Sequence, residues 1–286
     1  MNEKEPIIQV ENLVKRFGDQ VVLDGINLTV NHGETMVIMG GSGCGKSTLL
    51  RHMIGSYRPD EGRVLLFEED ITIMNEKQLN EVRKRFGILF QSGALFNSLT
   101  VAENVALPLQ EHTDLSPDVI DIMVKIKLEQ VKLRPASEKM PAQLSGGMKK
   151  RAGLARAIAL DPAILFYDEP SAGLDPVTSA EIDQLMMDLS KKLQVTSVVV
   201  THEMDSAFRI ADRMAMLDKG KMLRVDTRES FEVLRDHPNP ETLTEEEQLM
   251  RQFLRGDPEG PITDRKLSSD YAEDILGYKP VTSAIR

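Results

Sequence analysis

The sequence has no tryptophan, and Cys44 is its one cysteine among 286 residues. A lone cysteine excludes an intramolecular disulfide and is typical of a protein from a reducing compartment. Aromatic residues make up 5% of the sequence, which disfavours a surface that stacks nucleic-acid bases. No stretch approaches the roughly 18 consecutive apolar residues of a membrane span, and the first residues lack the layout of a signal peptide. We therefore expect a cytosolic protein that reaches a membrane only through a partner.

Positive charge is scarce relative to negative charge. The sequence holds 45 Asp and Glu residues against 35 Lys and Arg residues, a net charge of −10 at pH 7. A chain this acidic is a poor general binder of DNA or of anionic lipid headgroups, so we expect no nucleic-acid partner. Hydrophobic residues at 41% and charged residues at 28% are ordinary for a soluble globular protein.

Short apolar runs alternate with stretches of helical spacing over much of the sequence. Runs such as Ile164–Tyr167 and Val198–Val200 are wholly apolar, which is typical of parallel strands that are buried on both faces. This pattern predicts an α/β fold. Residues 93–160 differ, because they contain the helical segments Val101–Gln110, Ser116–Val131 and Gly146–Leu160 and no convincing strand. We interpret them as a helical subdomain inserted into the α/β core.

The composition changes again near residue 236, where Pro and acidic residues become frequent. We expect one nucleotide-binding domain over residues 1–236 and a C-terminal tail over 237–286. Within the tail, Thr244 and Glu247 have the spacing of a capping box, and an apolar stripe ends at Gly256. These features predict one short amphipathic helix in the tail.

The segment Gly40–Ser47 reads GGSGCGKS and matches the pattern GxxxxGK[ST] between a predicted strand, Thr35–Met39, and a predicted helix. We call this segment the phosphate loop. Glycines let backbone N–H groups surround phosphate oxygens, and the start of the helix reinforces them. Lys46 is predicted to neutralise the β- and γ-phosphates, and Ser47 to bind Mg²⁺. The predicted ATP-binding residues here are Gly40, Gly41, Ser42, Gly43, Cys44, Gly45, Lys46, Ser47 and Thr48.

Polar residues also follow three other predicted strands. Asp168 and Glu169 come after Ile164–Tyr167, and we predict that Asp168 holds Mg²⁺ while Glu169 polarises the attacking water. His202 follows the strand around Val198–Val200, where its imidazole would bind the γ-phosphate and orient the water. Gln91 ends the predicted strand over residues 87–90, and its amide can reach Mg²⁺ or water.

A second glycine turn, Ser145–Gly147, begins a basic helix and presents backbone N–H groups together with a helix dipole. Both suit a γ-phosphate, so a head-to-tail pair of subunits, each giving Ser145 to its neighbour's nucleotide, is one plausible geometry. Three other assignments leave alternatives. Phe17 stacks on adenine or belongs to the core, Cys44 is a small filler or a reactive thiolate, and Asp175 serves the nucleotide site or only starts a helix.

In this order the motifs GGSGCGKS, Gln91, LSGGM, ILFYDEP, SAGLD and His202 resemble those of the ATP-binding cassette (ABC) ATPases over about residues 5–235. The resemblance implies an ATP hydrolase with a P-loop NTPase fold, in which a RecA-like parallel sheet carries an antiparallel β subdomain and an inserted helical subdomain. It also implies a homodimer that sandwiches two ATP molecules. Lys46, Ser47, Gln91, Asp168, Glu169 and His202 would then come from one subunit, and Ser145, Gly146 and Gly147 from the other. Asp175 would communicate between the two sites.

A narrower resemblance, carried by the segments QSGALFNSLTVAENVALPLQEHTDLS, LSGGM and RQFLRGDPEGP, is to the ATPases of Mla-type (Mce-associated) lipid transport systems. It implies a multispanning permease, a periplasmic MCE-domain lipid-binding protein and, in some systems, a STAS-domain subunit. The implied cargo is phospholipid moved between the inner and outer membranes, with the ATPase at the cytoplasmic face of the bacterial inner membrane. The alternative is an ABC importer or exporter of another solute, because the core motifs do not read the cargo.

The segment after Gln91 is unusually apolar for a loop, with Leu95, Phe96 and Leu99. We expect these residues to form a groove for a cytoplasmic helix of the permease, and the alternative is that they pack internally. A GTP-binding switch is disfavoured, because the sequence has no guanine-reading NKxD motif.

Overall fold

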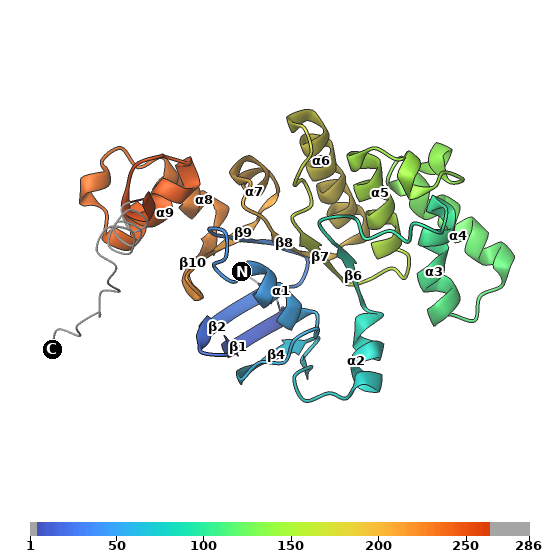
Figure 1. Ribbon diagram of the computed structural model, residues 1–286, viewed down its shortest axis with the longest axis horizontal. Coiled ribbons are helices and arrows are strands. Elements are labelled where there is room, and N and C mark those ends of the chain that lie inside the picture. The colour runs from blue at the N-terminus through green and yellow to red at the C-terminus, as the bar shows by residue number, and fades with distance from the viewer. Residues whose placement is uncertain (1–4, 264–286) are drawn as a thin grey trace. The chain divides into compact units, whose positions relative to one another are not determined.

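The computed structural model describes residues 5–263, which fold into two compact units that divide between Arg228 and Glu229 (Figure 1). The boundary predicted at residue 236 lies at the end of helix α8 (Arg228–Arg235), whereas the two units meet at its start. Within the described residues, no helix combines the length and the hydropathy that a membrane span needs.

The larger sheet of the first unit is the predicted parallel sheet. Its strands lie in the order β10-β9-β3-β8-β7-β6, and every neighbouring pair is parallel except β9 and β10. β8 is buried along its whole length, which explains its run of valines. The bounds are β3 Thr35–Met39, β6 Phe86–Leu89, β7 Ile164–Asp168, β8 Thr196–Val200, β9 Arg213–Asp218 and β10 Lys221–Thr227.

A smaller antiparallel sheet has the order β2-β1-β4-β5, with β1 Pro6–Phe17, β2 Gln20–Asn31, β4 Glu61–Leu66 and β5 Glu69–Asp70. Its apolar face packs with helix α1 (Lys46–Met53) against one face of the parallel sheet. The shared core contains Leu13 of β1, Ile38 of β3, Leu49 of α1 and Phe166 of β7. The antiparallel sheet is therefore fixed to the core next to the helix that begins in the phosphate loop.

Helices α6 (Pro176–Leu193) and α7 (Met204–Ile210) cover the opposite face of the parallel sheet from α1 (Figure 1). Helix α2 (Glu76–Arg83) was not predicted from the sequence. Asn75 and Gln78 form a capping box at its start, and this spacing is the feature that would have revealed the helix.

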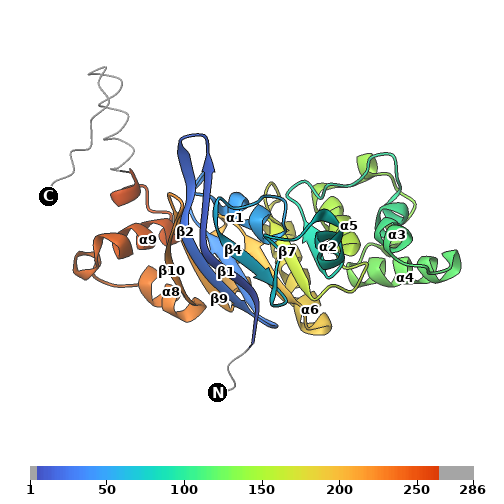
Figure 2. The same cartoon turned by 90° about the horizontal axis from the view of Figure 1, so that it is seen from below.

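The inserted subdomain contains only helices, turns and loops between residues 93 and 160. Its helices α3, α4 and α5 lie side by side (Figure 2), beyond β6 in the view of Figure 1. α3 begins at a capping box of Thr100 and Glu103, and α4 begins with Pro117 as predicted. The bounds are α3 Val101–His112, α4 Pro117–Gln130, the 3₁₀ turns η1 Arg134–Ala136 and η2 Pro141–Gln143, and α5 Gly146–Ala157.

In the second unit, the described residues form the remainder of α8, the 3₁₀ turn η3 (Pro240–Thr242) and α9 (Glu245–Arg255). α9 is the predicted tail helix. Thr244 and Glu247 form the capping box, and Gly256 ends the helix in the left-handed conformation with φ 69°.

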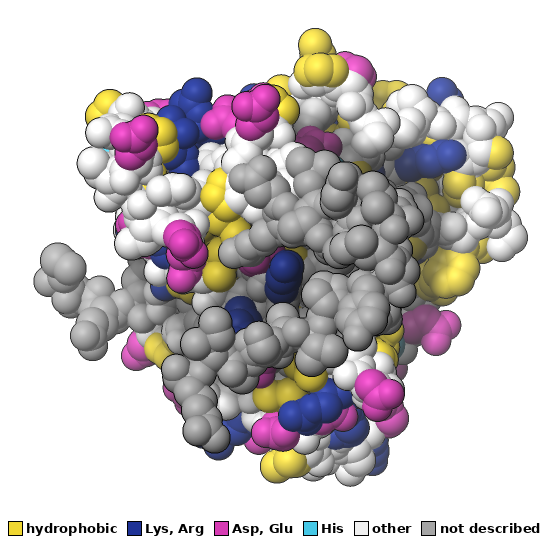
Figure 3. Space-filling model, turned by 60° about the vertical axis from the view of Figure 1, so that its left-hand side comes forward, with side chains coloured by type: hydrophobic (Ala, Val, Ile, Leu, Met, Phe, Trp, Pro, Cys, Tyr) yellow, Lys and Arg dark blue, Asp and Glu magenta, His cyan; other side chains and the backbone are white. Residues whose placement is uncertain are grey.

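Charged side chains of both signs are interspersed over the described residues on the face drawn in Figure 3. Many form exposed pairs, such as Arg63 with Glu11 at 2.7 Å and Arg85 with Glu69 at 2.6 Å. Exposed pairs contribute little to stability, because water screens them and ordering two long side chains costs entropy.

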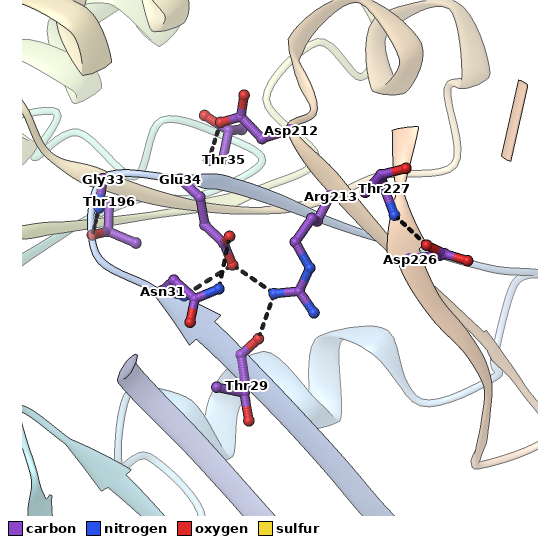
Figure 4. Close-up of polar contacts among 10 residues, drawn as sticks. All are labelled: Thr29, Asn31, Gly33, Glu34, Thr35, Thr196, Asp212, Arg213, Asp226 and Thr227. Atoms are coloured by element: carbon purple, nitrogen blue, oxygen red, sulfur yellow. Dashed lines mark hydrogen bonds and ion pairs between the residues drawn. The ribbon is translucent and has the colours of Figure 1, made fainter. Parts of the chain in front are cut away.

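A buried ion pair between Glu34 and Arg213 joins the two sheets (Figure 4). Glu34 is 3% exposed, and its carboxylate accepts hydrogen bonds from the backbone N–H and the side-chain amide of Asn31 and from Arg213 Nη1 at 2.9 Å. The same Arg213 nitrogen donates to the carbonyl of Thr29 on β2 at 3.1 Å. Since Arg213 starts β9, this cluster fixes the antiparallel sheet to the edge of the parallel sheet opposite the phosphate loop.

We predict that Glu34→Ala lowers the free energy of unfolding by about 2–3 kcal/mol, because it leaves the partly buried Arg213 guanidinium and the Asn31 N–H without their acceptor. Urea denaturation measures the change. The control is Glu61→Ala, which removes an exposed partner of Arg16 and should leave the urea midpoint unchanged. Equal midpoints for the two variants would contradict the structural role of Glu34.

Candidate nucleotide site

Four parallel strands end at one edge of the larger sheet, and a predicted site residue follows each of them. The phosphate loop follows β3, Gln91 follows β6, Asp168 ends β7, and His202 follows β8. The register pairs Asp168 with Val200 and Ile38 with Val200, so the ends of β3, β7 and β8 are neighbours. Ligands of open α/β sheets bind at this edge.

The backbone of the phosphate loop takes a path that only glycine allows at two positions. Gly40 has φ 150°, and a Cβ there would lie 2.1 Å from the carbonyl oxygen of Leu217. Gly45 has φ 112° and begins α1 without a side-chain cap, so the first N–H groups of α1 remain available to an anion. Lys46 is 8% exposed, and its Nζ donates to the carbonyls of Gly40 at 2.8 Å and Gly41 at 3.0 Å. The carbonyls of the phosphate loop thus hold the Lys46 ammonium group within the same loop whose N–H groups would bind phosphate.

Other predicted ATP-binding residues around the loop are accessible. Ser42, Gly43 and Ser47 are exposed, and Thr48 is half-buried. Phe17 ends β1 with 47% of its surface exposed, and its ring packs edge-on against Tyr57 at 5.7 Å. Lys15 Nζ also lies over the Phe17 ring, 5.5 Å from its centroid, and the exposed part of the ring is accessible to a base.

The structure brings Glu169 and His202 together, as the prediction of a shared role requires. His202 Nδ1 lies 2.9 Å from Glu169 Oε1, while Glu169 Oε2 is buried and has no hydrogen-bond partner among the described residues. Glu169 has φ 49°, and its N–H donates to the carbonyl of Val200 at 2.9 Å. Asp168 is half-buried, and burial together with the neighbouring Glu169 carboxylate raises the pKa of Asp168. Glu169 Oε2 is therefore a buried acceptor that the described residues leave unsatisfied.

The second glycine turn lies at the start of α5. Ser145 is exposed, and its Oγ caps the helix by accepting from the N–H of Met148 at 3.3 Å. A Cβ on Gly147 would lie 2.6 Å from Thr178 Cγ2, so this turn packs closely on α6. Among the described residues, no hydrogen bond or ion pair joins Ser145–Gly147 to the phosphate loop. One chain therefore presents two separate glycine-rich helix starts, at α1 and at α5.

Gln91 and Asp175 differ in detail from the predictions. β6 ends at Leu89, so Gln91 lies in the exposed turn beyond the strand rather than at its end. Asp175 caps α6 by accepting from the N–H groups of Val177 and Thr178, both at 3.1 Å, and from Thr178 Oγ1 at 2.5 Å. These bonds lower the pKa of Asp175. These contacts support the interpretation that Asp175 starts a helix. Communication between two nucleotide sites through Asp175 stays a prediction.

Lys150 is a site residue that sequence reasoning missed. It is 4% exposed, and its Nζ donates to the backbone carbonyl of Glu169 at 2.8 Å. Burial lowers the pKa of Lys150 to about 8, against the opposing effect of the carboxylates of Glu169, Asp168 and Glu203. In the sequence it is one of three consecutive basic residues. The helical phase it shares with the buried Gly147 and Leu154 is the feature that distinguishes it.

Of the two interpretations of Cys44, the structure contradicts the reactive thiolate. Cys44 is 5% exposed in the core beneath the phosphate loop, and burial raises the pKa of its thiol despite the nearby Lys46 ammonium. The alternative interpretation, a small filler residue, fits its position. A Cβ on Gly40 would lie 2.8 Å from Cys44 Sγ, which shows how closely the loop packs on the sulfur.

Comparison with known proteins identifies a family and several relatives. Residues 23–172 match the model of the ABC transporter family. The "Intermembrane phospholipid transport system ATP-binding protein MlaF" of Haemophilus influenzae is 40% identical over 270 residues, which cover 94% of this chain and 98% of that protein. The "Probable ribonucleotide transport ATP-binding protein mkl" of Mycobacterium leprae is 40% identical over 269 residues, covering 93% of this chain and 74% of that protein.

A solved structure, the dimeric post-hydrolysis state of the ATP-binding cassette MJ0796 bound to ADP and Pi, is similar with a TM-score of 0.72 and 31% identity. The match covers 77% of this chain and 98% of that chain. That structure is an ATP-binding cassette and shares the α/β architecture described above. The predicted P-loop NTPase fold is therefore confirmed.

We predict that N-ethylmaleimide labels Cys44 at least about tenfold more slowly in the folded chain than in urea at the same pH, because the thiol is buried and less ionised. Mass spectrometry follows the reaction. The matched control places a cysteine at the exposed neighbouring position, Ser42→Cys in a Cys44→Ala chain, which should label rapidly in the folded state. Equally rapid native labelling of Cys44 would contradict its burial.

Proposed function

Because this chain belongs to the ABC transporter family and hydrolyses ATP, we propose that it drives the movement of phospholipid between the inner and outer membranes of a bacterial envelope. The observation that carries the proposal is the 40% identity to the intermembrane phospholipid transport protein of Haemophilus influenzae over 270 residues. An alignment of that length extends well beyond Phe17 and His202, the outermost residues of the predicted ATP site. The likeness is therefore not limited to the ATPase motifs that all transporters of this family need.

We assign the ATP site to two copies of the chain that meet head-to-tail. Lys46 and the phosphate loop of one subunit hold the triphosphate, and Ser145–Gly147 of the other close over the γ-phosphate. The geometry supports this, because each chain carries two helix starts with available N–H groups that its own polar contacts do not join. The dimeric state of the similar cassette supports it as well. Asp175, beside the second glycine turn, would connect the two sites.

Within each site the side chains divide the work. Glu169 Oε2 accepts a proton from the attacking water, while His202 holds Oε1 and reaches toward the γ-phosphate. Lys46 compensates the charge on the β- and γ-phosphates, and the exposed part of the Phe17 ring supports adenine. The hydrogen bond between His202 and Glu169 fixes the orientation of the carboxylate. The activated water is thereby held in line for attack on the γ-phosphorus.

The oxygen donors at this edge of the sheet fit Mg²⁺. Ser47 offers a hydroxyl, Gln91 an amide oxygen and Asp168 a half-buried carboxylate, and Mg²⁺ prefers such hard ligands together with phosphate oxygens. Bound with ATP, the ion would compensate phosphate charge. Burial, together with the neighbouring Glu169 carboxylate, raises the pKa of Asp168, and a bound cation would offset both effects.

The loop after Gln91 is the proposed contact with a multispanning permease. Phe96 is 52% exposed, whereas Leu95 and Leu99 are half-buried. Asn104 is fully buried and fixes this loop, since its Nδ2 donates to the carbonyls of Phe96 and Leu99 and its Oδ1 accepts from the Phe96 N–H at 2.8 Å. A rigid loop that presents an aromatic ring suits a groove for a cytoplasmic helix.

By the same resemblance we propose an MCE-domain protein and a STAS-domain subunit as further partners, with the chain at the cytoplasmic face of the inner membrane. A second candidate function is transport of another solute. The ribonucleotide name of the Mycobacterium leprae relative favours it, because that protein is as similar to this chain as the phospholipid transport protein is.

We predict that the membrane complex purified through a tag on this chain contains an MCE-domain protein and bound phospholipid. Mass spectrometry identifies the subunits, and extraction followed by thin-layer chromatography identifies the lipid. The control is the same purification from cells that carry the untagged chain. Recovery of a soluble solute-binding protein without lipid would contradict phospholipid transport and support the second candidate.

We predict that Glu169→Gln lowers ATP hydrolysis by at least about 100-fold, because the amide cannot take a proton from water. ATP affinity, measured by equilibrium binding of a fluorescent ATP analogue, should change less than about threefold, since Glu169 does not hold the triphosphate. Glu138→Gln is the control, as it removes an exposed carboxylate that has no assigned role. Full hydrolysis by Glu169→Gln would remove Glu169 from the proposed mechanism.

A further inference from the structure

Lys150 has a contact that the ATP site described so far does not use. It lies on α5, the helix that Ser145 caps, and its Nζ donates to the backbone carbonyl of Glu169 at 2.8 Å. An ammonium group that is 4% exposed costs free energy to bury unless its surroundings compensate. The carboxylates of Asp168, Glu169 and Glu203 provide part of that compensation. A buried cation thus joins the helix that begins with the second glycine turn to the loop that carries the catalytic carboxylate.

The backbone of Glu169 needs such support. Its φ of 49° lies in the left-handed region, which side chains other than glycine seldom adopt without restraint from their surroundings. The N–H of Glu169 is held by Val200, and its carbonyl accepts from Lys150 Nζ and more weakly from the N–H of Ala172 at 3.3 Å. Of the three partners Val200, Lys150 and Ala172, Lys150 is the one that lies on α5. Its removal would free the Glu169 peptide to rotate and would turn the carboxylate away from the water.

We propose that Lys150 is a positioning residue that fixes Glu169 of its own chain to α5, so that the helix that begins with the second glycine turn also holds the catalytic carboxylate. This inference rests on the proposed two-subunit site. Ser145 of one subunit closes on the nucleotide of its neighbour, whereas Lys150 on the same helix holds Glu169 in the subunit's own site. Each α5 helix thereby serves both sites.

The first test compares Lys150→Met with Lys149→Met, the matched control. Both remove one charge from α5, but the Lys149 side chain makes no hydrogen bond or ion pair among the described residues. We expect Lys150→Met to lower kcat for ATP by about tenfold or more, to change KM less than about threefold, and to be partly rescued by Lys150→Arg. Lys149→Met should keep the parent kcat. If Lys150→Met yields little folded protein, Lys150→Gln, which keeps a donor, replaces it.

A purely structural role would lower the thermal midpoint and would change KM together with kcat. Parent kcat in both Lys150→Met and Lys150→Gln would overturn the inference.

The second test asks whether Lys150 acts on its own chain, using mixed dimers purified through two different tags. In the split arrangement, one full chain carries Lys150→Met and the other carries Ser145→Arg. The site built from the phosphate loop of the second chain and the glycine turn of the first is then intact, so we expect about half of the parent activity. When both substitutions lie on the same chain and the partner is unchanged, each site has one defect, and we expect almost none.

The reverse pattern, activity only with both substitutions on one chain, would show that Lys150 acts on the partner's site and would overturn the inference. Mixed dimers of Glu169→Gln and Ser145→Arg serve as the control. If this control pair regains activity in the split arrangement and the Lys150 pair does not, the inference alone fails. If neither pair regains activity, the two-subunit site itself is contradicted.

Discussion

The main constraint on this structure is that a highly charged triphosphate must be surrounded by groups of fixed positive potential. Two helix starts supply it, α1 at the phosphate loop and α5 at the second glycine turn, and both expose N–H groups that no side chain of their own helix fully satisfies. Lys46 adds a full charge within the first of them. Because the two helix starts lie on separate parts of one chain and share no polar contact within residues 5–263, we propose that two chains enclose one nucleotide.

The parallel sheet gives the site its precision. β3, β6, β7 and β8 are short, and the three neighbouring strands β3, β8 and β7 end in register, so the residues that follow them meet at one edge. Burial of the strands on both faces holds these ends in place, with the antiparallel sheet and α1 on one side and α6 and α7 on the other. The left-handed Glu169 at the end of β7 is the strained residue in this arrangement, and Lys150, Val200 and His202 hold its backbone and side chain from three directions.

Much of this architecture could be predicted from the sequence, because the strands that carry the site are apolar and bounded by turn residues. Thr35–Met39 was predicted with its observed bounds, and the Thr244 capping box located α9. Features that depend on tertiary burial could not be predicted in this way. The sequence left Cys44 as a small filler or a reactive thiolate, because its place at a helix start favours a thiolate whereas burial, which raises the pKa of the thiol, is set by the folded chain. Lys150 sits among basic neighbours, and the helical phase it shares with Gly147 and Leu154 indicates burial but not its contact with Glu169.

The central claim, that two chains enclose each nucleotide, is tested most directly by sedimentation of the full chain carrying Glu169→Gln, which should bind ATP without consuming it. The account predicts a dimer with ATP, a monomer without it, and a monomer in both conditions once Ser145→Arg blocks the second glycine turn. ATP binding itself should persist in that double variant, because the phosphate loop is unchanged. A dimer that forms with ATP just as readily after Ser145→Arg would contradict the account.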